Sequence, residues 1–450
     1  MRKPLIFAGL LSAGVLFVQT SEAQTVLNNL TFGQETIDLK NVPPDKNWKI
    51  EASVKGFYDD NINTTPSGAP GKTASWGMEM APSGVVGINT GQLEAAIGYG
   101  YNMKYYENRS NSADHRHLAG GMVAYELSPR ARIEAMNFFV VGQESDVLDP
   151  SGTFTTRVNG DNMRNLAGIG GFYELTRLLS LDVGYANYFV DYDNDGFAGS
   201  RSALLDRMEH RSSVELQWQP TDTTTGLVGY RFNVTDQTGD DPLAVLVGGN
   251  ITPDSRDSRS HSPYLGVQHR FSARLSGAVR AGVQFVEFPN LARVVAAAAP
   301  AAPAPDTDLI SPYAMANLAY SIGEGGSINM GASYDRSPTD LFALDANSAP
   351  TRDAGRAKVF SGISYQFTPR ITGRVNAEFH HVKYNGGAGD DTVDLVFLGG
   401  GGLEYLIIKN ASVFEEVSLE ASYAFDRLDS DTTLRGFSRH RVYLGLNAAF

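Results

Sequence analysis

From residue 47 onward, the chain is dominated by short runs in which apolar and polar residues alternate. In 371–380 the odd positions are apolar or glycine and the even positions are polar or charged, and 48–58 largely repeats this pattern with Trp48 and Tyr58 on its apolar side. A period of two is typical of β-strands whose two faces meet different surroundings. Slipping such a strand by one residue would place a Lys or Arg in lipid, at a cost of about 2 to 4 kcal/mol at the bilayer centre. The pattern predicts membrane-spanning strands with lipid on one face and a polar interior on the other.

Short polar turns recur about every 40 to 50 residues, which is the length of two strands and one longer loop. The turns are predicted at 89–91, 128–130, 176–177, 219–221, 272–274, 323–325, 368–370 and 409–411. The longer loops are predicted at 59–73, 107–115, 145–163, 191–205, 236–258, 289–307, 337–351, 385–391 and 427–436. Eight turns and nine loops predict an all-β fold: one transmembrane antiparallel β-barrel over 47–450 with about 18 strands, 16 being the nearest alternative, and both termini in the periplasm.

Aromatic residues on the apolar faces cluster at the strand ends. An outer belt is predicted from Tyr58, Tyr105, Phe189, Phe232, Phe285, Phe379 and Phe425, and an inner belt from Trp48, Trp218, Phe271, Phe367 and Phe450. Ten steps of about 3.3 Å separate Trp48 from Tyr58, which at about 45° tilt gives roughly 23 Å, close to the thickness of the apolar band of a barrel. A soluble β-sandwich would explain the alternation but not two belts of opposite sense.

The two ends of the sequence indicate export to the bacterial outer membrane. Residues 1–23 carry Arg2 and Lys3, an apolar stretch and a small-x-small ending, which is typical of a signal peptide. Residues 24–46 are expected on the periplasmic side, as a plug or a tether. The final aromatic, Phe450, is expected to be the membrane-insertion signal that the barrel-assembly machinery recognises.

Composition limits the chemistry that is expected. The chain has 0 Cys, so neither disulfides nor cysteine-bound metals can brace it. Its net charge of −13 argues against nucleic acid as a partner. The expected partners are outer-membrane lipid and lipopolysaccharide, no cofactor is expected, and the oligomeric state is left open.

Alternation also selects charged side chains for the barrel interior. The pore-lining candidates are Arg211, Arg231, Arg270, Arg280, Lys358, Arg374, Glu378, Glu420 and Arg441. Mixed signs at a constriction would produce a transverse field that favours small polar solutes. The alternative, favoured for any single residue, is that these charges pair across strands and only keep the interior polar.

Three further segments carry residues that could form a site. Asp191, Asp193 and Asp195 match the start of a calcium loop, but Ser202 stands where a Glu is expected, so a solvated loop tip is favoured. The adjacent His380 and His381 would point to opposite faces of a strand and cannot chelate together, so neither a catalytic set nor an enzyme is predicted. The Ala- and Pro-rich segment 293–305 is predicted to be extended, weakly ordered chain at the cell surface.

Several short motifs resemble one family of outer-membrane proteins. The element Asp59-Asp60-Asn61 follows Phe57-Tyr58, Ala81-Pro82 lies within the second strand, and Thr368-Pro369-Arg370 forms a turn. Together with the final segment 423–450, they are similar to the β-barrel porin 2 family. The resemblance implies a porin-like barrel without a catalytic set, and some members are encoded with polysaccharide-export systems. The predicted function is passive diffusion of small hydrophilic solutes, with an export-system barrel or, less favoured, an outer-membrane hydrolase as alternatives.

Overall fold

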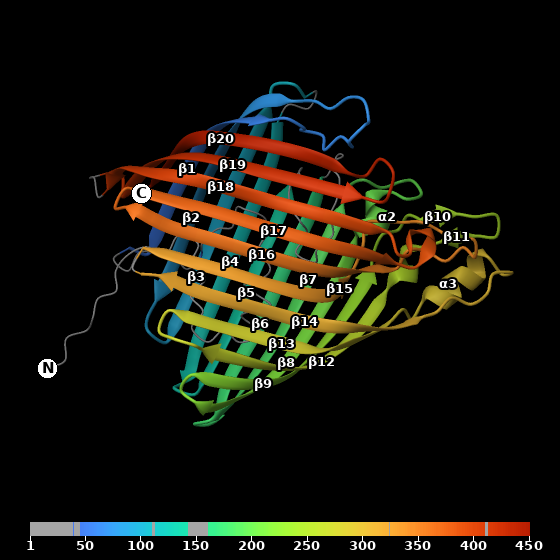
Figure 1. Cartoon of the computed structure of the whole chain (residues 1–450), viewed down its shortest axis with the longest axis horizontal. Coiled ribbons are helices and arrows are strands. Elements are labelled where there is room, and N and C mark those ends of the chain that lie inside the picture. Colours follow the sequence, from blue (N-terminus) through green and yellow to red (C-terminus); the bar gives the residue numbers. More distant parts are fainter. Residues whose placement is uncertain (1–38, 40–45, 110–112, 143–160, 324, 410–412) are drawn as a thin grey trace.

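The computed structural model describes residues 39, 46–109, 113–142, 161–323, 325–409 and 413–450. Eighteen antiparallel strands form one closed sheet, because the first strand pairs both with the second and with the last (Figure 1). The predicted fold class and strand number are therefore confirmed. The predicted signal peptide, most of 24–46, the loop 145–163 up to residue 160, and turn residues 324, 410 and 411 lie outside the described part of the chain.

The barrel strands are regular and 12 to 17 residues long. They are β1 Trp48–Asp59, β2 Ser75–Asn89, β3 Leu93–Tyr106, β4 Ala113–Ser128, β5 Ala131–Gly142, β6 Asn162–Thr176, β7 Leu179–Tyr192, β8 Arg207–Thr221, β9 Thr224–Gln237, β12 Ser258–Arg270, β13 Leu275–Glu287, β14 Asp308–Ile322, β15 Gly326–Ser337, β16 Asp353–Thr368, β17 Ile371–Asn385, β18 Val393–Lys409, β19 Glu416–Ser430 and β20 Phe437–Ala449.

Short connections gather at one end of the barrel, here called the turn end, and long ones at the other, the loop end (Figure 1). One predicted turn is displaced: β8 continues to Thr221, so the reversal lies at 222–223 and not at 219–221. Pro220, which lacks an N–H, lies where the ladder with β9 shifts register, and similar shifts precede the turns after β4, β6 and β16. A bulge inside a strand was thus mistaken for the turn that follows it.

The loop end carries small elements that alternation could not predict. They are α2 Arg201–Leu205, β10 Ala244–Val245, β11 Asn250–Ile251, η1 Pro253–Arg256, α3 Leu291–Ala298 and η2 Gly387–Gly389. The prediction of extended chain for 293–305 was wrong over α3. There Leu291, Val294, Val295 and Ala298 are buried at helical spacing, and prolines begin only at Pro300. In the described part of the chain, no helix is long and apolar enough to cross a membrane.

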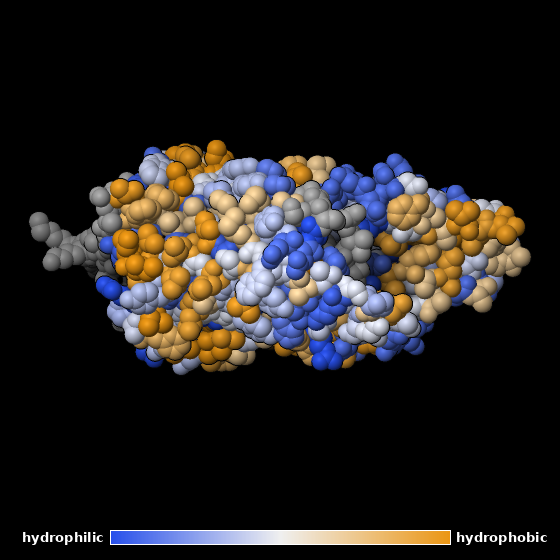
Figure 2. Space-filling model, turned by 90° about the horizontal axis from the view of Figure 1, so that it is seen from above, coloured by the Kyte–Doolittle hydropathy of each residue, from blue (hydrophilic) through white to orange (hydrophobic). Residues whose placement is uncertain are grey.

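The outward strand faces expose large apolar side chains. Ile97, Leu265 and Ile310 are each at least 65% exposed. The inner-belt residues Trp218 and Phe367 are likewise exposed near the turn end. On the face shown in Figure 2, apolar residues gather toward the turn end, hydrophilic residues are more abundant toward the loops, and a second apolar cluster lies at the tip of the loop end. An apolar surface this large on a closed sheet is typical of a barrel set in lipid.

Candidate functional site in the barrel interior

All nine predicted pore-lining residues lie on the strand faces that turn inward. The alternation is clearest on β13 and β17, where Val279 and Val375 are 50% and 57% exposed on the outside. Their neighbours Arg280 and Arg374 occupy the opposite face and reach acidic partners within the barrel. Arg270 lies at the turn end, where its guanidinium donates to the carbonyl of Asp222 at 3.0 Å.

The most enclosed group joins Glu215, Tyr264 and Arg280. Arg280 Nε donates to Glu215 Oε2 at 2.9 Å, and the Tyr264 hydroxyl donates to the same oxygen at 3.0 Å. β8 and β13 are separated by β9 and β12, so this contact crosses the concave inner surface. Gly229 on β9 leaves the space for the Tyr264 ring, since a Cβ there would lie 2.0 Å from it. Both charges are almost fully buried and held by one another.

A second group follows β8 toward the loop end. Glu209 accepts from Arg207 at 2.9 Å through one oxygen and from Arg211 at 2.6 Å through the other. On the neighbouring strand, Arg231 donates to the Tyr313 hydroxyl at 2.9 Å. Arg211 and Arg231, both predicted from alternation, therefore lie on adjacent strands β8 and β9.

A third group lies on β16 and β17. Glu378 accepts from Lys358 Nζ at 2.9 Å and lies 3.1 Å from His380 Nε2. Near it on β17, Arg374 donates to Glu404 of β18 at 3.0 Å, with 40% of its side chain exposed. Arg374 is thus more accessible than Arg280, which is buried in its ion pair.

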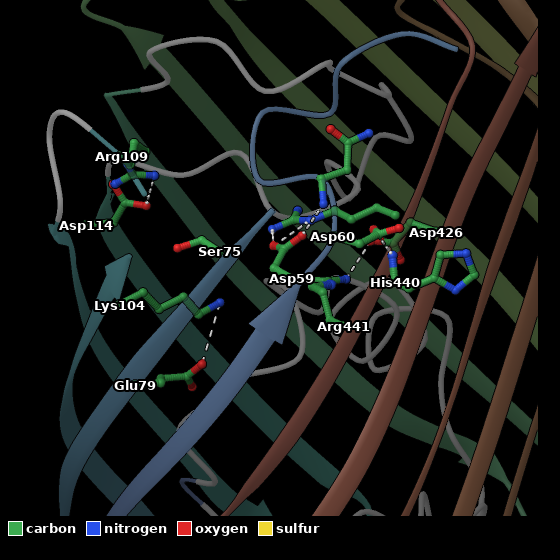
Figure 3. Close-up of polar contacts among 12 residues, drawn as sticks. Asp59, Asp60, Ser75, Glu79, Lys104, Arg109, Asp114, Asp426, His440 and Arg441 are labelled. Carbon is green, nitrogen blue, oxygen red and sulfur yellow. Dashed lines mark hydrogen bonds and ion pairs between the residues drawn. The ribbon is translucent and has the colours of Figure 1, made fainter. Parts of the chain in front are cut away.

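The fourth group joins the two ends of the barrel sheet. Arg439 of β20 donates to Asp59 of β1. Arg441 of the same strand donates to Asp426 of β19 (Figure 3). The neighbouring acid Asp60 accepts from the backbone N–H of His440 at 2.7 Å. The Asp59-Asp60 element, first noted as a family motif, therefore fastens the β1–β20 junction at the loop end.

Nearer the turn end of this junction, a predicted acid and the last residue also bridge strands. Glu420 of β19 accepts from Lys55 of β1 at 3.1 Å and from Asn447 of β20 at 2.9 Å. Phe450 follows β20 and donates its backbone N–H to Ile50 of β1 at 2.9 Å. Its ring centroid lies 5.0 Å from that of Phe414. Phe450 therefore pairs with the first strand of the barrel.

These contacts favour the interpretation that the charged residues pair across strands and keep the barrel interior polar. Glu215, Glu378 and Glu420 each hold at least one cation within hydrogen-bonding distance. Ionised pairs of this kind keep a wall polar without leaving a strong net field at each site.

An apolar stretch of the inner wall was missed. It is formed by inward-facing Val85, Ala96, Leu118, Met122, Phe138, Val140, Leu166 and Tyr188 of β2–β7, here called the apolar wall. The register aligns them across neighbouring strands, as in the pairs Ala96 with Met122 and Phe138 with Leu166. The signal was available in 118–123 and 166–172, where both faces of the strand are apolar or glycine. On β2–β7 the inner wall therefore combines an apolar patch with ion pairs, such as Lys104 with Glu79 and Arg132 with Glu126.

Leu39 lies against the apolar wall. It is 6% exposed and packs within the same cluster. A Cβ on Gly120 of β4 would lie 3.5 Å from its Cδ1, an ordinary contact distance, but only 2.8 Å from the ring of Phe138, so the glycine leaves room for Phe138 beside Leu39. Of the predicted segment 24–46, the structure describes this residue and Lys46, and it places Leu39 inside the barrel.

Two carboxyl groups are buried in the loop-end elements. Burial raises the pKa of Asp206 to about 7, against hydrogen bonds from Ser202 and the Tyr192 N–H that favour the ionised form. Burial likewise raises the pKa of Asp257 to about 6, although it accepts from the Gln237 N–H and from Asn290. These loops therefore contain groups that titrate near neutral pH.

The proposed calcium loop does not gather its acids. Asp191 lies within β7, whereas Asp193 and Asp195 follow the strand. Among the described residues, no three His, Cys, Asp or Glu side chains come together as a metal site.

Comparisons with known proteins identify similar barrels at low similarity. No protein-family model matches the sequence, and no curated protein matches it. Among solved structures, the outer membrane protein opdK from Pseudomonas aeruginosa is 11% identical with a TM-score of 0.43, covering 90% of this chain and 99% of its own. OccK2 (OpdF) from the same organism is 10% identical with a TM-score of 0.43, covering 90% and 98%. The FrpB iron transporter from Neisseria meningitidis is 11% identical with a TM-score of 0.42, covering 92% and 83%.

The closed sheet, the apolar outer face and the charged interior together define the architecture of an outer-membrane β-barrel. The function of this barrel is inferred from the side chains that line its interior.

Proposed function

We propose that the chain is an outer-membrane, porin-like channel through which small hydrophilic solutes diffuse passively. The observation that carries this proposal is the set of inward ion pairs whose side chains remain partly exposed, namely Arg374 with Glu404, Lys358 with Glu378 and Lys55 with Glu420. Charged groups without lipid contact and on a common concave surface are stabilised by water within the barrel. An 18-stranded barrel is wider than those whose interior is filled by wall side chains alone.

The partly exposed ion pairs of the interior suggest how a solute would move. Pairs such as Arg374 with Glu404 offer replacement hydrogen bonds to a hydroxyl or carboxylate that leaves water. The apolar wall offers none, so a polar solute would pass from one ion pair to the next. Each contact is a single paired group, which is weak enough to release the solute. The membership of the β-barrel porin 2 family is part of this proposal, as are the lipid and barrel-assembly partners.

Single-channel recording of the purified, folded protein in planar bilayers tests the proposal. Stepwise currents in KCl that persist without an energy source are the expected result. A folded, heat-modifiable barrel that inserts but passes no current would remove the diffusion channel from consideration.

Leu39 supports a second candidate, the barrel component of an envelope polysaccharide-export system. Leu39 belongs to the amino-terminal segment and is held inside the barrel. A channel that is closed at rest would require a segment in this position. Leu39→Asp should release it, because an ionised carboxylate is unfavourable on an apolar wall. An increase in conductance from near zero would favour the export barrel, whereas an open wild-type channel that changes little would favour the porin.

The hydrolase alternative gains less support. His380 lies beside Glu378, but within the described residues no Ser hydroxyl bonds to either of them. Glu378 also contacts Lys358, whose ammonium group stabilises the ionised carboxylate.

A further inference from the structure

Five histidines on the outward face of the barrel are each joined to a tyrosine on the adjacent strand. The hydroxyl oxygen lies 2.5 to 2.7 Å from Nδ1 in every pair. The pairs are Tyr99–His117 and Tyr101–His115 between β3 and β4, Tyr185–His210 between β7 and β8, Tyr230–His261 between β9 and β12, and Tyr423–His440 between β19 and β20. Because the pairs recur around the barrel, they are called the Tyr–His belt.

The belt lies where the apolar outer surface ends. His261 and His440 are register partners of Phe232 and Phe425, two of the outer-belt aromatics, with ring centroids 4.8 Å apart in both cases. One outward position beyond His261 toward the loops stands the exposed Arg259. The histidines are thus at the level where lipid chains give way to headgroups.

The hydrogen bonds to Nδ1 leave Nε2 of each imidazole ring as a donor for a molecule outside the protein. A neutral imidazole that accepts the tyrosine hydroxyl at Nδ1 carries its own proton at Nε2. Among the described residues, no hydrogen bond to Nε2 of His117, His210, His261 or His440 is formed within the protein. A polar N–H facing the edge of a bilayer is unfavourable until an acceptor meets it.

We propose that the Tyr–His belt binds the phosphate groups of lipids in the leaflet around the loop end. This inference rests on the proposed membrane location. Phosphate oxygens are strong acceptors fixed at headgroup depth, which matches both the chemistry and the level of the rings. At His261 the exposed Arg259 adds a cation, since its register partner Glu287 forms no ion pair with it in the described structure. The partner is therefore a phosphorylated lipid, such as the diphosphorylated glycolipid of an outer leaflet.

Lipid binding to the refolded full-length barrel, measured by native mass spectrometry from detergent, tests the proposal. The probes are diphosphoryl lipid A and the same glycolipid without its phosphates. The variant H117F/H210F/H261F/H440F keeps an aromatic ring at each position but removes the donor. It should bind diphosphoryl lipid A about tenfold more weakly, because hydrogen bonds to charged groups are lost, and should bind the dephosphorylated glycolipid as the wild type does.

Two controls separate this role from packing. H269F removes the histidine near the turn end, beside Phe271, and should leave both affinities unchanged. Equal affinity of the quadruple variant and the wild type for diphosphoryl lipid A would overturn the proposal, as would an equal loss for both lipids, which would mean that the pairs only pack. Conductance is measured separately, so a barrel that binds the phosphorylated lipid but passes no current would contradict the channel and not the belt.

Discussion

At the scale of single residues, Arg280 and Glu215 behave as a unit. Both are nearly excluded from solvent and are joined at 2.9 Å. Arg280→Met should therefore destabilise the barrel by about 3 to 5 kcal/mol, because it leaves a buried carboxylate without its cation. The double variant Arg280→Met/Glu215→Leu should recover much of that loss. Urea unfolding in lipid vesicles measures both, and a double variant as unstable as the sum of the singles would contradict the coupling.

Arg374 and its neighbour Val375 allow a test of which face of β17 contacts water. The background has 0 Cys, so Arg374→Cys and Val375→Cys each introduce a single thiol. A charged, membrane-impermeant thiol reagent should label Arg374→Cys, whereas only a membrane-soluble reagent should label Val375→Cys. Val279→Cys is the matched control on β13 and should behave as Val375→Cys does. Reversed labelling on β17 would mean that the strand register is wrong.

At the scale of elements, the loops of the loop end should loosen as pH rises. Asp206 and Asp257 have a higher pKa in the folded loops, about 7 and about 6, than in an unfolded chain. The folded loops therefore bind more protons, and their stability falls as pH increases from about 4 to about 7. The Tyr192 and Gln237 amides donate to these carboxylates. Between pH 5 and pH 8, their hydrogen-exchange rates should rise more steeply with pH than the intrinsic rate of an unprotected amide does.

The control for this pH dependence is Asp206→Asn. It keeps an acceptor for the Tyr192 N–H but does not titrate, so exchange at that amide should lose its extra pH dependence. An unchanged profile in this variant would remove Asp206 as the cause.

Strands and their register could be predicted because the membrane imposes one simple rule on every strand. Arg280 and Val279 had to lie on opposite faces whatever their neighbours were. Their partners could not be predicted, since Glu215 is three strands away from Arg280 around the barrel and 65 residues earlier in the chain. The apolar wall was not predicted, because the alternation rule assigns apolar residues to the outward face. Helix α3 was not predicted, because its eight residues come just before a proline-rich stretch that favours extended chain.

At the scale of the whole molecule, partly exposed arginines of the inner wall should set the ion preference of the channel. Replacing Arg231 and Arg374 by Gln leaves Glu404 without its cation and should increase the cation-to-anion permeability ratio by about twofold or more. Reversal potentials in a KCl gradient measure the ratio. The effect should shrink near 1 M salt, where charges are screened over about 3 Å. Arg427→Gln, on the outward face, is the matched control, and an equal shift there would contradict a luminal origin.

The Asp59–Arg439 pair has a consequence for how the barrel is completed. Its partners are 380 residues apart in sequence, so the contact needs nearly the whole chain to have been made. Pairings between neighbouring strands enclose short loops, whereas this one closes the longest loop and carries the largest entropic cost. The junction of β1 with β20 should therefore be the last to form. A chain cut short before β20 would keep β1 with one edge unpaired, and this single ion pair would then distinguish a finished barrel from an unfinished one.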